Sequence, residues 1–177
     1  MTAELQTPRL ILQPLAANHA DDLFHVFSDE ATMRYWHHPP HRQSHQTTVM
    51  IQHLLASEAA CWWAIVLREN NRAIGYVGYL GTTIPGMGYI LHSDYWRQGY
   101  GTEAVNAALK YGFTILGLNR VELWINDGNV ASQRLAQKVG FTRRGQFSMR
   151  YQHHPTPHEK YVYGLRAEEW AEKTQAS

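Results

Sequence analysis

A short glycine-containing turn near the middle of the chain carries the residue types that hold phosphate. The turn, residues 96–101 (WRQGYG), follows a short apolar segment and precedes an amphipathic stretch at 102–116. The first amides of a helix lack intrahelical partners, and the helix dipole places partial positive charge there. Gly99 and Gly101 would let the main chain approach a pyrophosphate closely, and Arg97 adds a cation. The turn is therefore a candidate phosphate site, although many helices begin with glycine turns for structural reasons alone.

Two better-known phosphate motifs do not fit this sequence. The pattern G-x-x-x-x-G-K-[ST] of P-loop proteins does not occur. The dinucleotide fingerprint G-x-G-x-x-G lacks its third glycine, because Ala104 stands at that position. That fingerprint also requires strands and helices alternating around a parallel sheet, which the predicted element order does not supply.

The elements that must position this turn follow from hydrophobic periodicity and turn residues. We predict helices capped by Asn18 and Ser44, and a hairpin around residues 69–71. We expect Gly117 to end the helix that follows the turn. The predicted strands are 9–15, 61–67, 73–80, 88–91 and 120–126, then two alternating strands through Phe147, Met149 and Tyr151 and through Tyr161, Tyr163 and Leu165; the predicted helices are 18–29, 44–56, 102–116 and 130–139. This order predicts an α/β (α+β) domain with a mixed, mostly antiparallel twisted sheet of about seven strands flanked by about four helices.

Four segments, in the same order, resemble one known family. Residues 95–104 (YWRQGYGTEA) are similar to the pyrophosphate loop Q/R-x-x-G-x-G/A of the GNAT superfamily of acetyltransferases. Residues 129–141 (NVASQRLAQKVGF) resemble its later block, which runs from an asparagine to Gly-Phe. The opening 7–12 (TPRLIL) and the closing 161–170 resemble the branch that acetylates the N-terminal alanine or serine of ribosomal proteins. The resemblance covers nearly the whole chain, so we expect a single GNAT domain over residues 1–177.

The resemblance implies a binding site for acetyl-CoA as co-substrate. It implies that the sheet splays between its fourth and fifth strands to admit the pantetheine arm, and that Asn129 bonds this arm. Amides near Ile90 and Leu91 would polarise the thioester carbonyl as an oxyanion site. Arg134 and Lys138 are further candidates for the cofactor phosphates, although most surface cations simply face solvent. The main-chain amides that the resemblance assigns to the pyrophosphate belong to Arg97, Gln98, Gly99, Tyr100, Gly101 and Thr102.

Two positions depart from the general family pattern. Trp96 stands where the motif has Gln or Arg, and an aromatic residue there resembles the ribosomal-protein branch. Ala136 stands where many GNAT enzymes have the tyrosine that protonates the departing thiolate. Ser132 lies one helical turn earlier and resembles a serine of the ribosomal-protein branch, so we predict it as the proton donor and a cofactor contact. The alternative is a serine that satisfies the backbone at its own helix end.

The acceptor amine must be neutral to attack, so a base or a water chain should deprotonate it. The sequence does not select the base: Glu103 fits an ordinary first helical turn, and Glu122 lies mid-strand among apolar neighbours. The resemblance places residues 35–38 over the acceptor pocket, with residues 152–158 as an opposite wall. The other candidate bases are His37, His38, His41 and His92; the predicted substrate-binding residues are Tyr35, Trp36, His37 and His38.

Composition excludes several other classes of protein. The 177 residues carry 16 Lys and Arg against 15 Asp and Glu, too balanced for general nucleic-acid binding. Cys61 is the only cysteine, which excludes an internal disulfide and fits a reducing compartment. The N-terminal segment lacks the apolar core of a signal peptide, and the longest apolar run, 61–67, is too short to span a membrane. The histidine runs match no metal motif. We therefore expect a cytoplasmic protein, monomeric or homodimeric, without metal, membrane or nucleic-acid partners.

These observations predict direct transfer of the acetyl group of acetyl-CoA to a primary amine, without a covalent enzyme intermediate. The predicted acceptor is the α-amine of a protein or peptide N-terminus. A small amine such as a polyamine, an amino acid or an antibiotic is the rival acceptor, and a broad anionic cleft would favour polyamines. A non-catalytic module that binds acyl-CoA is the remaining alternative, because Ala136 removes the usual acid.

Overall fold

The computed structural model describes residues 2–36, 38–57, 60–81, 86–150 and 157–175. Strands and helices alternate irregularly along the chain. Two short 3-10 helices are also present: η1 (Ala17–His19), and η2 (Ser93–Tyr95), which comes just before the turn at 96–101. The strands are β1 (Leu5–Gln6), β2 (Leu10–Pro14), β3 (Cys61–Leu67), β4 (Ala73–Tyr79), β5 (Met87–Leu91), β6 (Arg120–Asn126), β7 (Thr142–Met149) and β8 (His158–Arg166). The helices are α1 (Ala20–Ser28), α2 (Glu30–Met33), α3 (Ser44–Leu55), α4 (Tyr100–Thr114), α5 (Val130–Val139) and α6 (Ala167–Gln175).

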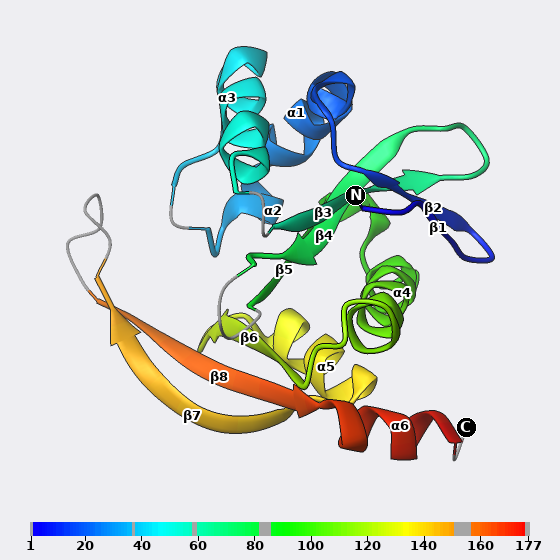
Figure 1. The fold of residues 1–177 in the computed structure, drawn as a ribbon. Coiled ribbons are helices and arrows are strands. Elements are labelled where there is room, and N and C mark those ends of the chain that lie inside the picture. The colour runs from blue at the N-terminus through cyan, green and yellow to red at the C-terminus, as the bar shows by residue number, and fades with distance from the viewer. Residues whose placement is uncertain (1, 37, 58–59, 82–85, 151–156, 176–177) are drawn as a thin grey trace.

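The first sheet contains β1 to β5 in sequence order, and all of its described pairs are antiparallel. Helices α1 and α3 cover one face of this sheet, and α4 covers the other (Figure 1). The middle strand β3 is buried along its whole length, which explains its unbroken apolar sequence. Trp63 and Ile65 belong to the hydrophobic core between the first sheet and α4, called here the α4 core. Trp62 and Ala64 belong to the core between the sheet and helices α1 and α3, called here the α1–α3 core. One strand therefore contributes to two cores through the alternation of its side chains.

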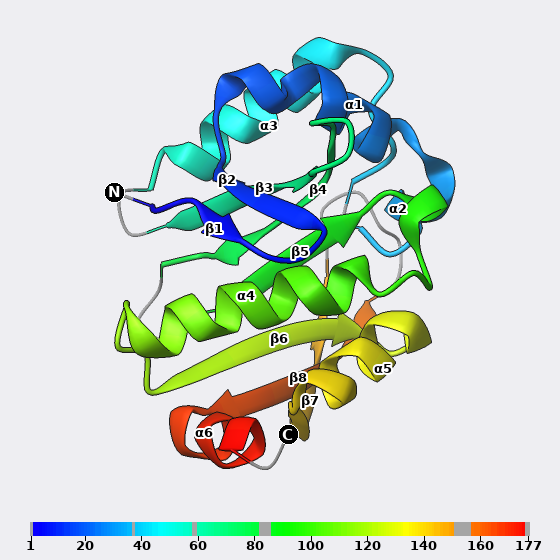
Figure 2. The same ribbon diagram turned by 90° about the vertical axis from the view of Figure 1, so that its right-hand side faces the viewer.

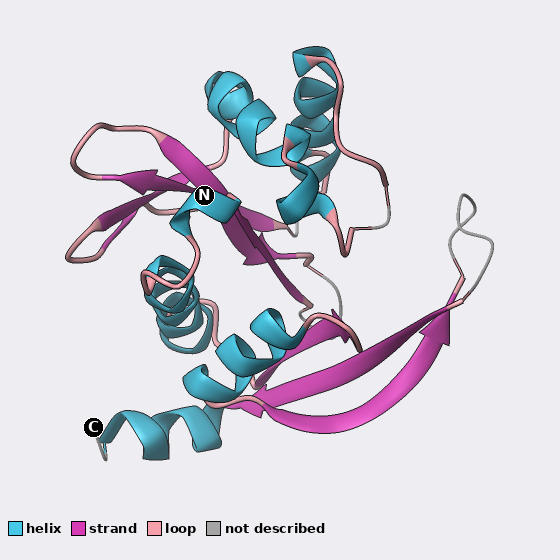
Figure 3. Ribbon diagram, turned by 180° about the vertical axis from the view of Figure 1, so that it is seen from behind, coloured by secondary structure: helices cyan, strands magenta, loops and turns pink. Residues whose placement is uncertain are grey.

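The second sheet has the order β6-β8-β7, again antiparallel throughout. Strands β7 and β8 form a long curved hairpin that extends away from the first sheet (Figures 1 and 3). Val121, Leu123 and Ile125 of β6 point into the α4 core, which also receives Ala136 and Val139 of α5. Helix α4 thus lies between the two sheets, with α5 beside it (Figure 2).

The two sheets meet where β5 and β6 run parallel. Within the described part of the chain, their pairing consists of a single bridge, Gly86 to Glu122, at the start of both strands. Beyond this bridge the strands diverge without further pairing, which leaves the C-terminal edge of β5 open toward β6. The predicted splay between the fourth and fifth expected strands is therefore confirmed; the additional short strand β1 makes them β5 and β6. The predicted mixed, mostly antiparallel fold is also confirmed.

Several predicted boundaries change in the structure. The strands at 61–67 and 120–126 and the helix at 130–139 match the prediction, but α4 begins two residues early and ends at Thr114, before Gly117. The predicted cap at Asn18 is wrong, because this residue lies inside η1, and His19 Nδ1 accepts from the Ala16 amide at 3.1 Å. The sequence did not predict β1, α2 or α6. In the described residues, no helix has both the length and the apolar character required to cross a bilayer.

Candidate functional site

The predicted phosphate turn has a backbone shaped to enclose an anion. Arg97 has φ +61° and Gly99 has φ +86°, so two residues of the turn adopt the left-handed conformation. Left-handed residues placed among right-handed ones direct successive amides into a shared concavity that binds anions. Gln98 supports the turn, because its Nε2 donates to the Asp94 carbonyl at 2.8 Å. The turn therefore has a specific shape as well as a suitable composition.

Helix α4 continues this arrangement with unpaired amides. Gly99 is its N-cap, and the first helical hydrogen bond runs from Glu103 N to Gly99 O at 3.0 Å. The amides before Glu103 precede this bond and point out of the helix end toward the turn. Gly101 also allows close packing, since a Cβ there would lie 2.9 Å from Leu135 Cδ1 of α5. Its amide is one of those before Glu103, so Gly101 stays a predicted contact of the phosphate.

Arg9 stabilises the conformation of the phosphate turn, and the sequence did not predict Arg9 as a site residue. Its Nη1 donates to Gln98 O at 2.8 Å, and its guanidinium stacks 4.3 Å from the centre of the Tyr100 ring. Its Nη2 pairs with Glu103 Oε2 at 2.7 Å. The segment 7–12 contains Arg9 and resembles the family, but that resemblance did not indicate what Arg9 does.

The same contacts give Glu103 a structural role. Its Oε1 accepts from Thr7 Oγ1 at 2.6 Å and from the Arg9 amide at 2.9 Å, in addition to the Arg9 guanidinium. Burial alone would raise the pKa of Glu103, but the bonds from Thr7 and Arg9 outweigh burial and hold its pKa below the usual value. A carboxylate stabilised in this way is a poor proton acceptor. The geometry thus argues against Glu103 as the base.

The open edge of β5 presents two amides toward β6. At the ends of β5, His92 N donates to Ile74 O and Leu80 N donates to Gly86 O, both at 2.9 Å. Alternate residues of an antiparallel strand direct their backbone groups to opposite sides. The amide of Ile90 therefore faces β4, whereas those of Tyr89 and Leu91 face the gap. Of the two predicted oxyanion amides, Leu91 is placed for the role and Ile90 is directed away from it.

Trp96 closes one end of this edge. Its Nε1 donates to Leu91 O at 2.7 Å, while its ring remains 42% exposed. An aromatic residue at this position therefore ties the phosphate turn to the end of β5. This bond gives a structural reason for the departure from Gln or Arg.

The N-terminus of α5 lies across the gap from β5. Asn129 is its N-cap, and its Oδ1 accepts from Ser132 N at 3.2 Å. Ser132 Oγ lies 2.7 Å from Tyr89 Oη. No role for the Tyr89 side chain was predicted from the sequence. Ala136, which stands where many GNAT enzymes have the tyrosine, is fully buried, so this position packs in the core. Lys138 is exposed in the last turn of α5, where its carbonyl accepts from Lys173 Nζ at 2.6 Å.

Glu122 lies on the face of β6 opposite the α4 core. Val121 and Leu123 point into that core, so the alternation places Glu122 with Trp124 and Asn126 on the other face. Its Oε1 is 3.5 Å from Arg120 Nη2, and its side chain is 18% exposed. Glu122 therefore shares a face of β6 with Asn126, which lines a cavity beside Tyr35.

A cavity of about 230 Å³ lies on this same side of the gap. It brings together residues from the loop after α2, the end of β6 and the start of β8. The Tyr35 ring lies against Gly128, and the Tyr35 carbonyl accepts from Asn126 Nδ2 at 2.6 Å. The other amide atom, Asn126 Oδ1, is buried without a hydrogen-bond partner among the described residues. The lining residues are Arg34, Tyr35, Trp36, Asn126, Asp127, Gly128 and His158.

The predicted acceptor-side residues are therefore partly brought together. Tyr35 and Trp36 line the cavity, and His158 is its opposite wall, but His37 and residues 151–156 lie outside the described part of the chain. The His38 ring stacks on the His41 ring, with centroids 5.1 Å apart, behind the cavity. His41 Nδ1 bonds Thr47 Oγ1 at 2.8 Å. Burial, with a smaller contribution from His38, lowers the pKa of His41 to about 4.

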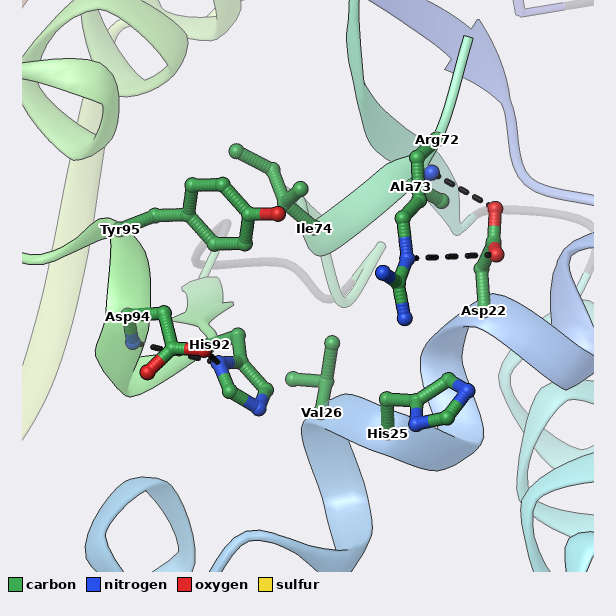
Figure 4. A pocket seen from close by; sticks show the side chains of 9 residues that line it. All are labelled: Asp22, His25, Val26, Arg72, Ala73, Ile74, His92, Asp94 and Tyr95. Carbon is green, nitrogen blue, oxygen red and sulfur yellow. Dashed lines mark hydrogen bonds and ion pairs between the residues drawn. The ribbon is translucent and has the colours of Figure 1, made fainter. Parts of the chain in front are cut away.

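His92 lies in a separate hollow of about 70 Å³ between α1, the start of β4 and η2 (Figure 4). Its Nδ1 accepts from the Asp94 amide at 3.2 Å, and Asp22 opposite is paired with Arg72. The hollow shares no lining residue with the cavity beside Tyr35 and Asn126. Across the described ranges, no group of three or more His, Cys, Asp or Glu side chains is arranged to hold a metal ion.

Comparison with known proteins identifies the fold that these features build. Residues 9–142 match the profile of the acetyltransferase (GNAT) domain family. The chain belongs to the GNAT acetyltransferases. A related protein is the uncharacterized N-acetyltransferase YoaA of Bacillus subtilis (strain 168), 29% identical over 168 residues, which cover 91% of this chain and 95% of that protein. GNAT acetyltransferases transfer acetyl groups from acetyl-CoA, so the chain is an N-acetyltransferase.

Two solved structures show the range of acceptors on this GNAT fold. A Vibrio cholerae protein provisionally assigned as a ribosomal-protein-serine acetyltransferase is 25% identical, with a TM-score of 0.79 over 94% of this chain and 99% of that one. The spermidine N-acetyltransferase of Vibrio cholerae, solved with CoA and spermine, is 16% identical, with a TM-score of 0.79 over 93% and 99%. The second likeness establishes the fold alone. Fold similarity therefore leaves the acceptor to be argued from the site.

Proposed function

We propose that this GNAT enzyme acetylates the α-amine of a protein or peptide N-terminus. The binding of the acetyl donor, acetyl-CoA, is supported by the two left-handed residues Arg97 and Gly99, which lie next to the unpaired amides of α4. These groups fit a diphosphate, and the open edge of β5 fits an extended pantetheine arm. In this proposal the donor contacts are Leu91, Arg97, Gln98, Gly99, Tyr100, Gly101, Thr102, Asn129, Ser132 and Lys138.

The proposed chemistry follows from the groups that face the gap. The neutral amine attacks the thioester carbonyl, and the amide of Leu91 stabilises the oxyanion that forms. The carbon–sulfur bond then breaks, and Ser132 gives its hydroxyl proton to the departing sulfur. Glu122 is the carboxylate on the acceptor side and is our choice over Glu103 for assisting amine deprotonation, directly or through water.

The charges of the acceptor cavity support an N-terminal α-amine over a polyamine. Among the described residues, its lining carries one carboxylate, Asp127, and one guanidinium, Arg34. A polyamine has several cations and needs several anions, whereas an α-amine needs one.

An acceptor screen tests this proposal directly. Purified protein is incubated with acetyl-CoA and short peptides beginning with Ala or Ser, and thiol release and peptide mass are followed. The matched control is the same peptide with a blocked N-terminus and an internal lysine. We expect acetylation of the free peptide at the α-amine and none of the blocked peptide. Spermidine or an amino acid turning over faster than every peptide would contradict the assignment.

Asp127 provides a variant that tests the acceptor side separately. Asp127 Oδ1 accepts from the Gly128 amide at 2.7 Å, and an asparagine keeps an oxygen there for this bond. Asp127→Asn removes the charge, so we expect the acceptor KM to rise roughly fivefold to twentyfold, the range of a lost charged contact. CoA affinity should not change. Asp94→Asn is the control, since Asp94 is an exposed acid in the other hollow.

A further inference from the structure

Two hydroxyl groups meet at the gap between the sheets, one from each wall. Tyr89 projects from β5 and Ser132 from the first turn of α5, and their oxygens are 2.7 Å apart. Tyr89 Oη also lies 3.3 Å from the Ser132 carbonyl. Both residues are half-buried as a whole, and their hydroxyls meet where the two walls of the gap come together. The residues are 43 positions apart in sequence, and only the folding of α5 against β5 brings them together.

We propose that Tyr89 is a positioning residue that orients the Ser132 hydroxyl toward the sulfur of the departing CoA. The phenol donates to Ser132 Oγ, which leaves the proton of the serine free to point into the gap. The inference rests on the proposed function, because it assumes that Ser132 is the proton donor to sulfur.

The local structure explains why Ser132 needs such a partner. A serine in the first turn of a helix can instead turn its hydroxyl to a nearby backbone carbonyl, where its proton is unavailable to a ligand. Here the Ser132 amide is fixed by Asn129 Oδ1, and Tyr89 Oη lies 2.7 Å from Ser132 Oγ, close enough for the phenol to donate the hydrogen bond that the proposal assigns to it. The phenol is itself held, because the Tyr89 ring packs against the α4 core.

Tyr89 remains a neutral donor at working pH. Burial raises the pKa of Tyr89 to about 12, although the bond to Ser132 acts in the opposite direction. One turn further along α5, Ala136 has no hydrogen to donate and is fully buried. Among the described side chains, the hydroxyls facing this part of the gap from β5 and α5 are therefore those of Tyr89 and Ser132.

The proposed step balances in atoms and charge. When the tetrahedral intermediate collapses, the carbon–sulfur bond breaks and its electron pair goes to sulfur. The Ser132 O–H bond breaks and an S–H bond forms, so the products are the amide and CoA thiol. Ser132 then recovers a proton from solvent, equal to the one that the acceptor nitrogen releases. Tyr89 keeps its own proton, and its bond to Oγ strengthens as negative charge grows on that oxygen.

A double-mutant cycle on kcat tests the positioning role. Tyr89→Phe, Ser132→Ala and the double variant are compared by thiol release, with the best acceptor or with water as a slow acceptor. We expect Ser132→Ala to lower kcat about 100-fold, the value of a positioned acid, and Tyr89→Phe about tenfold. In the double variant the loss should equal that of Ser132→Ala alone. The KM for acetyl-CoA should stay within about twofold.

Controls separate this role from general packing. Tyr79→Phe also removes a tyrosine hydroxyl from the α4 core, since Tyr79 Oη donates to Ala108 O at 2.8 Å, but it lies away from the gap and should leave kcat unchanged. Ser132→Thr keeps a hydroxyl and should recover part of the rate. An equal loss from Tyr89→Phe with and without Ser132 would overturn the positioning role.

Two other results have separate meanings. A normal kcat for Tyr89→Phe beside a slow Ser132→Ala would reject positioning and leave the proposed acid intact. A normal kcat for Ser132→Ala at saturating substrate would reject both the acid and the residue that positions it. In that case the peptide screen still decides the acceptor independently.

Discussion

The donor and acceptor sides of this enzyme are constructed in different ways. Most of the proposed donor side is one contiguous stretch, from Leu91 to Thr102, whose backbone conformation shapes the phosphate turn; the remaining proposed contacts come from α5 and its cap. The acceptor cavity instead combines the loop at 34–36, the end of β6 and the start of β8. The first surface is mainly backbone amides, and the second is mainly side chains of mixed charge.

This difference indicates how one fold serves many acceptors. Main-chain amides at a helix end bind a diphosphate with little dependence on side-chain identity, so the donor site tolerates sequence change. A cavity lined by side chains from three separate segments changes whenever any of them changes. We therefore expect variants on the two sides to affect different constants, CoA affinity on one and acceptor KM on the other.

Gly99→Val should give the largest effect and should disable the donor side alone. The left-handed φ of +86° is strained for a β-branched residue, and a Cβ there would lie 3.2 Å from Arg9 Nη2. We expect CoA affinity, measured by calorimetry, to fall by roughly 100-fold, equivalent to about 3 kcal/mol. Gly117→Val is the control, because Gly117 also has positive φ but lies at the far end of α4. Equal losses in both variants would point to global destabilisation.

Arg9→Met should have an intermediate effect on the same side. The substitution removes the bond to Gln98 O and the pairing with Glu103, so the turn loses its support from β2 while its own sequence is unchanged. We expect CoA affinity to fall about tenfold, the value of one well-placed hydrogen bond. Arg68→Met is the matched control, since Arg68 holds the same N-terminal segment through Thr7 O without touching the turn. Unchanged affinity in Arg9→Met would show that the turn holds its shape alone.

Acidification should have the smallest effect and should act on the acceptor side. His41 has a folded pKa of about 4 and an unfolded value of about 6.5, so unfolding takes up a proton between these values. Its contribution to stability is therefore complete above pH 6.5 and is lost as the pH falls toward 4. His41→Asn should flatten this dependence by about 2 kcal/mol, measured from urea midpoints at pH 7 and pH 5. An identical pH dependence in both proteins would contradict the assignment to His41.

The parts of the fold that were predicted correctly depend on local sequence. The seven apolar residues of β3, the alternation in β6 and the four-residue spacing in α5 each encode their own element. Strand β1 was missed because two residues carry no periodicity, and α6 because its hydrophobic face is weak and its first turn is stabilised by Glu169 accepting from the Arg166 amide at 2.9 Å. Such elements depend on neighbours that a local pattern does not contain.

The sequence by itself predicted a glycine-containing helix start at residues 96–102 that suits an anion, because glycine placement and unpaired amides are properties of a short segment. Only the tertiary structure decided which amides of β5 face the gap, that Arg9 closes on Glu103, and that Tyr89 meets Ser132. These contacts join residues from dozens to nearly a hundred positions apart, and the packing of α4 and α5 between two sheets brings them within hydrogen-bonding distance.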